Sequence, residues 1–389
     1  MKKTIVCILI VSILLLPTMQ IYGESSTKSK AETEASIECS LVKSAVLMEA
    51  TTGDIIYSKE ENKKLIPASV TKIMTLLLVA EAIAEGKIAL TDEVKISAFA
   101  ASMGGSQVFL KEGEAMSVEE LLKCTVIASA NDAAVALAEL VAGSESVFVA
   151  MMNKRAQELG MNDTYFENVT GLDDTTENHL TTALDIALMS RELIKHDIII
   201  KYSSLWQDTI RNGEFTLTNT NRLVRFYDGC NGLKTGSTSK AGYCMSATAK
   251  RNGMQLIAVV MGAETRDMRN ETVRKLLDYG FANYELFIND EAPLEDTSVR
   301  FGTKNNTMLY EGEFCKLVAR SDASKIEKVY NVPEYITAPV SEKESIGKVE
   351  FILNGEKIGE TNIFSKDNIE KISLWQFFMR IICNIFKPQ

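Results

Sequence analysis

The chain has 389 residues, of which 46% are hydrophobic and 24% are charged, and its formal net charge is −10 at pH 7. These ordinary globular values exclude a disordered chain and a polytopic membrane protein, and the length allows two or three domains. The acidic balance, together with the lack of any basic run in the sequence, argues against nucleic acid as a partner.

The first residues have the pattern of a secretory signal. Lys2 and Lys3 precede an apolar run over residues 5–16, and Gly23 is a small residue at a plausible cleavage point. The run is too short to span a bilayer comfortably, although a retained N-terminal anchor is the alternative. We predict a signal peptide over residues 1–23 and therefore a secreted, extracytoplasmic protein.

A flexible leader and then a mixed region of strands and helices are expected next. Residues 24–40 are polar with almost no apolar side chains, which is typical of a flexible segment. Within residues 41–288, a strand hairpin near residues 45–57 precedes several helical patterns, and three antiparallel strands between residues 232 and 262 precede a helix over residues 270–287. This order suggests one sheet, built from both ends of the region, with helices packed on it.

The C-terminal part of the sequence changes character twice. Residues 289–365 hold short alternating runs separated by turn residues, which predicts a small all-β domain. Residues 366–389 have a helical pattern that is apolar nearly all round, apart from a narrow polar stripe. We expect an amphipathic helix that lies at the membrane surface, because it looks too short to span; a helix docked on the protein is the alternative. The large apolar side chains of this helix are Trp375, Phe377, Phe378, Ile381, Ile382 and Phe386.

Cysteine and histidine usage limits the possible chemistry. The seven cysteines are widely spaced without a Cys-x-x-Cys pair, which is not a disulfide-scaffold pattern, and the only histidines are His179 and His196. A zinc site or a Ser-His-Asp triad is therefore poorly supported, although one histidine could in principle serve as a base. We expect no metal and no cofactor, and lysine is the better candidate for a catalytic base.

Ser69 and Lys72 form the first candidate catalytic pair. They lie three residues apart at a predicted helix start after Pro67, so their side chains share one face about one turn apart. A serine hydroxyl becomes a useful nucleophile when a base takes its proton, and a buried lysine with a lowered pKa can be that base. Alone, the pair could equally be an N-cap serine beside a solvated lysine.

Two further segments complete the pattern. Ser129 and Asn131 lie where a predicted helix is interrupted, which exposes polar side chains at a helix end. Lys234, Thr235 and Gly236 lie in a predicted strand, where the glycine lets a substrate backbone lie close. Taken singly, these are a capping serine and an ordinary strand lysine. The three motifs in this order are a strong signal, shared by class A β-lactamases and penicillin-binding proteins.

With these motifs, the sequence resembles the serine-type D-alanyl-D-alanine carboxypeptidases, the low-molecular-mass penicillin-binding proteins of the peptidase S11 family. The likeness covers about residues 41–365, and the tail resembles the family's amphipathic anchor. The resemblance implies an α+β fold, in which a β-lactamase/transpeptidase-like domain (an antiparallel sheet flanked by helices) is followed by a small all-β domain and a C-terminal amphipathic helix. It also implies an enzyme that removes the terminal D-alanine from peptidoglycan pentapeptide stems and is acylated and inhibited by penicillin.

The resemblance implies catalytic roles for four residues. Ser69 would be the acylated nucleophile and Lys72 its general base, while Ser129 and Lys234 would shuttle a proton to the leaving D-alanine. These roles agree with the chemistry of the residues themselves, because two lysines and a bound carboxylate would form a charge-coupled cluster.

The same resemblance implies a substrate-binding set. Asn131 would bind the substrate amide and Thr235 its terminal carboxylate, with Gly236 and Ser237 beside them on the same strand. The oxyanion hole would consist of the backbone N–H groups of Ser69 and Ser237.

Two other interpretations remain open. Class A β-lactamases carry a deacylating glutamate in a Glu-x-x-Leu-Asn loop; Glu167 lies at a comparable distance after Ser129, but residues 167–171 do not match that loop. The second alternative is an inactive wall-binding structural protein, and the complete set of motif residues argues against it.

One departure from some relatives concerns an arginine upstream of the Lys-Thr-Gly strand. Residues 219–222 read Asn-Thr-Asn-Arg here, which leaves open which residue is the second partner of the substrate carboxylate.

Overall fold

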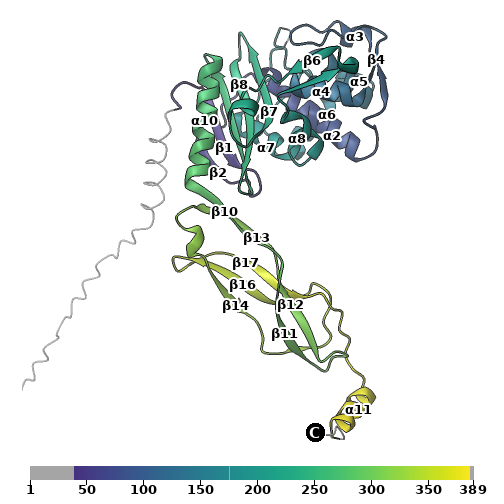
Figure 1. The fold of residues 1–389 in the computed structure, drawn as a ribbon, viewed down its shortest axis with the longest axis vertical. Helices are drawn as coiled ribbons and strands as arrows, with labels where there is room; N and C mark the ends of the chain where they lie inside the picture. Colours follow the sequence, from purple (N-terminus) through teal and green to yellow (C-terminus); the bar gives the residue numbers. More distant parts are fainter. Residues whose placement is uncertain (1–38, 175, 386–389) are drawn as a thin grey trace, which may run out of the picture. The chain divides into compact units, whose positions relative to one another are not determined.

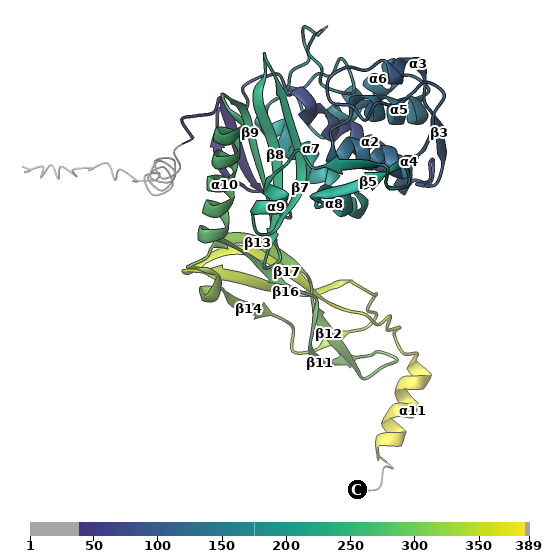
Figure 2. The ribbon, with the colours of Figure 1, turned by 45° about the horizontal axis from the view of Figure 1, so that its top comes forward.

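The computed structural model describes residues 39–385 of the protein, apart from residue 175. The predicted signal peptide over residues 1–23 and nearly all of the predicted leader over residues 24–40 lie outside the described residues. Figures 1 and 2 show two kinds of architecture, one with helices on a central sheet and one made almost entirely of strands.

A five-stranded antiparallel sheet organises the first of these parts. Its order is β2-β1-β9-β8-β7, so the N-terminal hairpin pairs with the last strand of the region, and Val46 lies opposite Val259. Helix α10 covers one face of the sheet and α7 the other (Figures 1 and 2), which explains why β1 and β9 are buried along almost their whole length. The strands are β1 (Ser44–Glu49), β2 (Ile55–Lys59), β7 (Cys230–Thr238), β8 (Gly242–Arg251) and β9 (Met254–Ala263).

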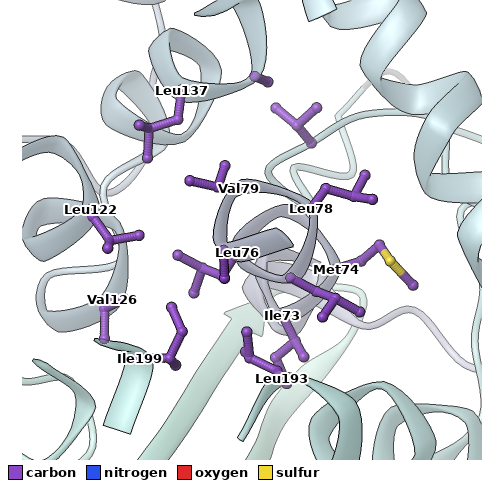
Figure 3. Packing of buried hydrophobic residues seen from close by; sticks show 14 of the residues in the cluster. Ile73, Met74, Leu76, Leu78, Val79, Leu122, Val126, Leu137, Leu193 and Ile199 are labelled. Atoms are coloured by element: carbon purple, nitrogen blue, oxygen red, sulfur yellow. The ribbon is translucent and has the colours of Figure 1, made fainter. Parts of the chain in front are cut away.

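Helix α2 (Lys72–Ala84) lies at the centre of the helical layer. Most of its residues are buried, because it is apolar on nearly every side and other helices surround it. A short 3-10 turn, η1 (Ala68–Thr71), leads directly into it. The core therefore fixes the N-terminal end of α2, where Ser69 and Lys72 lie. Figure 3 shows Ile73, Met74, Leu76, Leu78 and Val79 of α2 packed among Leu122, Val126, Leu137, Leu193 and Ile199.

The surrounding helices begin and end at recognisable signals. A capping box of Ser117 and Glu120 starts α4, and the interruption at Ser129 separates α4 from α5. Two small hairpins complete this part, β3 (Glu93–Lys95) with β4 (Ala115–Ser117) and β5 (Gln207–Ile210) with β6 (Phe215–Thr218). The remaining helical elements are α3 (Ala98–Ala101), α4 (Val118–Ile127), α5 (Asn131–Ala142), α6 (Glu145–Glu158), α7 (Ala183–Leu193), α8 (Asp197–Ser203), η2 (Arg211–Gly213), α9 (Leu223–Phe226) and α10 (Arg266–Asn283).

The second part confirms the predicted small all-β domain. A six-stranded sheet has the order β14-β16-β17-β12-β11-β15, and β10 pairs with β13 beside it. It has its own apolar core, in which the rings of Phe314 and Phe351 stack at 4.2 Å between centroids. The elements are β10 (Tyr284–Asn289), β11 (Ala292–Arg300), β12 (Asn306–Glu311), β13 (Phe314–Ala319), η3 (Ala323–Lys325), β14 (Glu327–Asn331), β15 (Ile336–Thr337), β16 (Ser345–Leu353) and β17 (Glu356–Ser365).

The expected C-terminal helix is α11 (Leu374–Ile385). Its side chains Leu374 and Trp375 are 90% and 70% exposed. The guanidinium of Arg380 donates to the backbone carbonyls of Gly302 (3.1 Å) and Thr303 (3.2 Å). Among the described residues, no single helix is long and apolar enough to cross a membrane. The bent pair of α5 and α6 reaches the required length and apolar character when the two helices are taken together.

Candidate active site

The turn before α2 brings Ser69 and Lys72 into direct contact. Lys72 Nζ lies 3.0 Å from Ser69 Oγ and donates to the backbone carbonyl of Thr170 at 2.9 Å. Lys72 is fully buried, which excludes the solvated lysine that the sequence alone allowed. The nucleophile and its candidate base are therefore within proton-transfer distance, and the base is shielded from solvent.

The electrostatic environment favours a neutral Lys72. Burial, assisted by the charge of Lys234, holds the pKa of Lys72 well below the ordinary lysine value, and Asp132 acts in the opposite direction. The Asp132 carboxylate is itself engaged, because it accepts the backbone N–H groups of Val108 and Leu110. A lysine in this state can accept the proton of Ser69.

Ser129 and Lys234 form a second serine–lysine pair. Lys234 Nζ donates to Ser129 Oγ at 2.7 Å and to the carbonyl of Thr235 at 2.8 Å. Ser129 has φ of 63°, in the left-handed region, and this turn between α4 and α5 directs its side chain to the lysine. Burial, together with the charge of Arg269, lowers the pKa of Lys234 from 10.5 to about 7. This pair can therefore take up or release a proton near neutral pH.

Asn131 presents a hydrogen-bond acceptor at the first turn of α5. Its Nδ2 donates to the carbonyl of Gly104 at 2.7 Å, which fixes the orientation of the amide. Its Oδ1 atom is buried and has no hydrogen-bond partner among the described residues. Because a buried polar atom normally has a partner, this oxygen suits a substrate N–H group.

The β7 edge of the sheet carries the third motif. A Cβ atom at Gly236 would lie 2.9 Å from Pro67 O, Ser69 N and Val70 N. Glycine is therefore required because the strand and the nucleophile turn touch through their backbones, a reason that differs from the close substrate approach expected from the sequence. Thr235 Oγ1 donates to Thr220 Oγ1 at 2.7 Å, on the adjoining loop.

A cavity of about 560 Å³ joins these features. Five of the eight candidate residues line it, whereas Lys72, Asn131 and Lys234 are not part of the lining. The candidate residues in the lining are Ser69, Ser129, Thr235, Gly236 and Ser237.

Three arginines also line this cavity, and the sequence reasoning missed two of them. Arg222 belongs to the run that left the carboxylate partner open, while Arg266 and Arg269 come from the first turns of α10. Arg269 is buried, and its burial, with the nearby charge of Arg266, lowers its pKa to about 10. The sequence did contain a signal, because Arg266 and Arg269 lie three residues apart at the start of a helix. That spacing indicates an anion-binding role only when the structure shows both arginines in the same cavity as Ser237.

Glu167, the residue that would matter in a class A β-lactamase, is engaged elsewhere. Its Oε2 atom accepts the backbone N–H groups of Glu177 (2.9 Å) and Asn178 (3.1 Å). From the loop over residues 166–172, the group that reaches Lys72 is the Thr170 carbonyl. A deacylating carboxylate is therefore not what this loop presents to the candidate base.

The described residues contain no cluster of three or more His, Cys, Asp or Glu side chains arranged to hold a metal ion. Cys39, Cys124, Cys230, Cys244 and Cys315 are free thiols. No His, Cys, Asp or Glu side chain is among the described residues that line the cavity.

Known protein families match most of the chain. Residues 28–265 match the D-alanyl-D-alanine carboxypeptidase family, peptidase S11, and residues 281–371 match the C-terminal domain of penicillin-binding protein 5. The chain is 42% identical over 346 residues to the D-alanyl-D-alanine carboxypeptidase DacF of Bacillus subtilis, covering 87% of this chain and 88% of DacF. It is 35% identical over 349 residues to DacC of Escherichia coli, covering 86% of each chain.

Solved structures of penicillin-binding proteins are also similar to this chain. Penicillin-binding protein 5 of Haemophilus influenzae superposes with a TM-score of 0.72 at 33% identity, covering 85% of this chain and 98% of that one. Penicillin-binding protein D2 of Listeria monocytogenes, in its ampicillin-bound form, has a TM-score of 0.57 at 30% identity, covering 62% of this chain and 97% of that one.

Proposed function

The chain belongs to the peptidase S11 family of D-alanyl-D-alanine carboxypeptidases, and from this premise we propose that Ser69 is its nucleophile, activated by Lys72. The protein is a serine carboxypeptidase that acts on stem peptides ending in D-Ala-D-Ala and reacts with β-lactams. The observation that carries the residue assignment is the 3.0 Å approach of Lys72 Nζ to Ser69 Oγ, with Lys72 fully buried.

The proposed reaction has two halves. In the first, Ser69 Oγ attacks the carbonyl carbon of the penultimate D-alanine while Lys72 takes the hydroxyl proton, and the backbone N–H groups of Ser69 and Ser237 bind the oxyanion. The C–N bond then breaks, and the Ser129–Lys234 pair delivers a proton to the amine of the departing D-alanine. Lys72 then passes the proton that it took from Ser69 to the Ser129–Lys234 pair and is neutral again. In the second half, water attacks the acyl carbon while Lys72 takes the water proton, the ester C–O bond breaks, and Lys72 returns the proton to Ser69 Oγ.

The proposed substrate-binding roles rest on the cavity lining for Thr235 and on the unpartnered Oδ1 atom for Asn131. The Oδ1 atom of Asn131 would accept an N–H group of the bound peptide. The Thr235 hydroxyl would turn from Thr220 to donate to the terminal carboxylate. Arg269 is the best second partner for that carboxylate, because it is a buried cation in the wall of the same cavity. A β-lactam would acylate Ser69 in the same way, but its amine stays attached to the acyl group and hinders the entry of water.

Intact-protein mass spectrometry tests the nucleophile. After incubation with penicillin, the unmodified protein should gain the mass of one penicillin, whereas Ser69→Ala should gain none and should release no D-alanine from a pentapeptide. Ser106→Ala is the matched control, because Ser106 lines the same cavity yet is not bonded to Lys72 or Lys234, and it should still form the adduct. An adduct on Ser69→Ala would contradict the assignment.

We also propose the export and attachment that the sequence predicts, with a signal peptide over residues 1–23 and an interfacial anchor within residues 366–389. The exposed Leu374, Trp375 and Phe378 of α11 support an interfacial helix. Arg380 is engaged with two carbonyl groups, so the apolar side chains would carry most of the membrane affinity.

Fractionation tests the anchor. The full-length protein should stay with membranes in high salt and be released by detergent. A protein ending at Ile372, which lacks α11 but keeps Ile369 of the all-β core, should be soluble and still release D-alanine from small peptides. A truncated protein that still sediments with membranes would place the anchor elsewhere, and a soluble but inactive one would make the tail part of the fold.

A further inference from the structure

His179 is a buried residue that the proposed reaction does not use, yet it contacts both segments that hold Lys72. It lies in the connection before α7 and is only 3% exposed. Its Nδ1 atom accepts the backbone N–H of Glu167 at 3.1 Å, and its Nε2 atom lies 2.8 Å from Thr71 Oγ1. Thr71 is the residue immediately before Lys72, and Glu167 lies in the loop whose Thr170 carbonyl accepts from Lys72.

The hydrogen bonds define the protonation state of the imidazole. A backbone N–H can donate only to an unprotonated nitrogen, so the proton of the neutral ring is on Nε2, which donates to Thr71 Oγ1. Burial lowers the pKa of His179 to about 4, although Glu167 and Asp173 act in the opposite direction. The ring therefore stays neutral at physiological pH and connects the two segments through one acceptor and one donor.

The loop over residues 166–172 and the nucleophile turn are packed tightly where they cross. A Cβ atom at Gly171 would lie 1.9 Å from the carbonyl oxygen of Ala68 and 2.7 Å from Thr71 Oγ1. Asn168 fixes the loop internally by accepting the N–H groups of Thr170 and Gly171. The position of the Thr170 carbonyl against Lys72 Nζ thus depends on how this rigid loop is seated on the turn.

That carbonyl matters because it sets the direction of the lysine lone pair. A neutral amine has two N–H bonds and one lone pair, so donating one N–H to Thr170 O helps to turn the lone pair toward Ser69 Oγ. A loop displaced by a fraction of an ångström would misdirect the base and admit water beside it. Since burial is the main cause of the lowered pKa of Lys72, added water would favour the protonated, inactive lysine.

We propose that His179 is a positioning residue for catalysis: as a neutral imidazole it ties the loop over residues 166–172 to the turn that carries Ser69, and so holds the Thr170 carbonyl against Lys72. The proposal rests on the assignment of Lys72 as the base. The other charged groups that act on Lys72 come from different elements, Lys234 on β7 and Asp132 on α5, and substitutions at the His179 link leave both in place.

Thr71→Val tests the link with minimal change of shape. Valine removes the hydroxyl that His179 contacts, whereas the matched Thr71→Ser keeps it. A displacement of the base of about 1 Å costs about 10²-fold in rate, so Thr71→Val should acylate with penicillin about 10- to 100-fold more slowly, and Thr71→Ser should retain most of the rate. In addition, the pH midpoint of acylation should move upward in Thr71→Val and stay in place in Thr71→Ser.

A second pair of substitutions tests the imidazole itself. His179→Phe keeps a ring beside Phe166, whose edge contact has a centroid distance of 5.6 Å, but it removes both hydrogen bonds. His179→Gln can still donate to Thr71. We expect His179→Gln to acylate faster than His179→Phe, with a pH midpoint closer to that of the unmodified enzyme. If His179→Phe does not fold, the Thr71 pair decides the question alone.

The outcomes separate this proposal from the proposed function. Lys72→Ala serves as the reference. If Lys72→Ala loses acylation while Thr71→Val keeps the original rate and pH midpoint, the positioning role is wrong and the base assignment stands. A slower Thr71→Val with an unchanged midpoint would also overturn the positioning role, since it would reflect only a structural loss. If Lys72→Ala acylates normally, the base assignment itself fails.

Discussion

Lys234→Met should stabilise the folded protein most strongly at low pH, and this effect should shrink as the pH rises. Lys234 is buried, and burial with the charge of Arg269 lowers its pKa from 10.5 to about 7. Between these values the unfolded state binds a proton that the folded state does not. Lysine at this position therefore destabilises the fold fully below about pH 7, and progressively less as the pH rises to about 10.5.

The size of the effect follows from the shift. At about 1.36 kcal/mol per pKa unit, the destabilisation is about 5 kcal/mol at pH 6 and about 2 kcal/mol at pH 9. Methionine also removes the hydrogen bonds of Lys234 to Ser129 and Thr235, which offsets the gain by about 1 to 2 kcal/mol each at any pH. The pH dependence is the informative quantity: the free energy of unfolding of the variant, relative to the unmodified protein, should fall by about 3 kcal/mol between pH 6 and pH 9.

Urea unfolding at pH 6 and pH 9 provides the measurement. Lys250→Met is the matched control, because Lys250 is an exposed lysine on the neighbouring strand β8, and its effect on unfolding should be the same at both pH values. A difference between Lys234→Met and the unmodified protein that does not change with pH would refute the electrostatic reasoning.

Two further substitutions test the site through the rate of acylation, followed by rapid mixing with a fluorescent penicillin. Lys72→Arg should acylate about 10²-fold more slowly or worse, because a guanidinium stays protonated and cannot act as the base. The unmodified enzyme should acylate faster as the pH rises, since the lowered pKa of Lys72 lets it become neutral. An arginine variant that acylates at the normal rate would count against this role. Gly236→Ala should lose about 10²-fold, because its Cβ would lie 2.9 Å from the backbone of Pro67, Ser69 and Val70 and would displace the nucleophile. Unchanged acylation by a folded Gly236→Ala would show that the turn relaxes freely.

The sequence predicted the features that depend on local spacing. A separation of three residues at a helix start brings Ser69 and Lys72 together whatever the rest of the fold does, and the structure places them in contact. The antiparallel sheet, the flanking helices and the all-β domain also follow from hydrophobic periodicity and element order, and the comparisons support the same fold.

The features that the sequence did not predict depend on long-range packing or on the backbone. Arg269 reaches the cavity only because α10 begins where β9 ends, beside the far end of β7. The Thr170 carbonyl that contacts Lys72 carries no residue-type signal, since any residue has a carbonyl group. The contact of Arg380 with the carbonyls of residues 302 and 303 likewise joins segments far apart in the chain, so no local sequence pattern could predict it.

The charge distribution explains why a substrate with a terminal carboxylate suits this cavity. The protein carries a net charge of −10, yet Lys72, Lys234 and Arg269 are buried around one site. Buried charges are costly unless they are paired, and here burial lowers the pKa of both lysines and so weakens their tendency to be charged. A carboxylate bound beside Thr235 and Arg269 would stabilise the charged form of the nearer lysine, Lys234. A protonated Lys234 would in turn disfavour a charge on Lys72. We therefore expect substrate binding to separate the two lysines into one acid and one base, which is the division of roles that acylation requires.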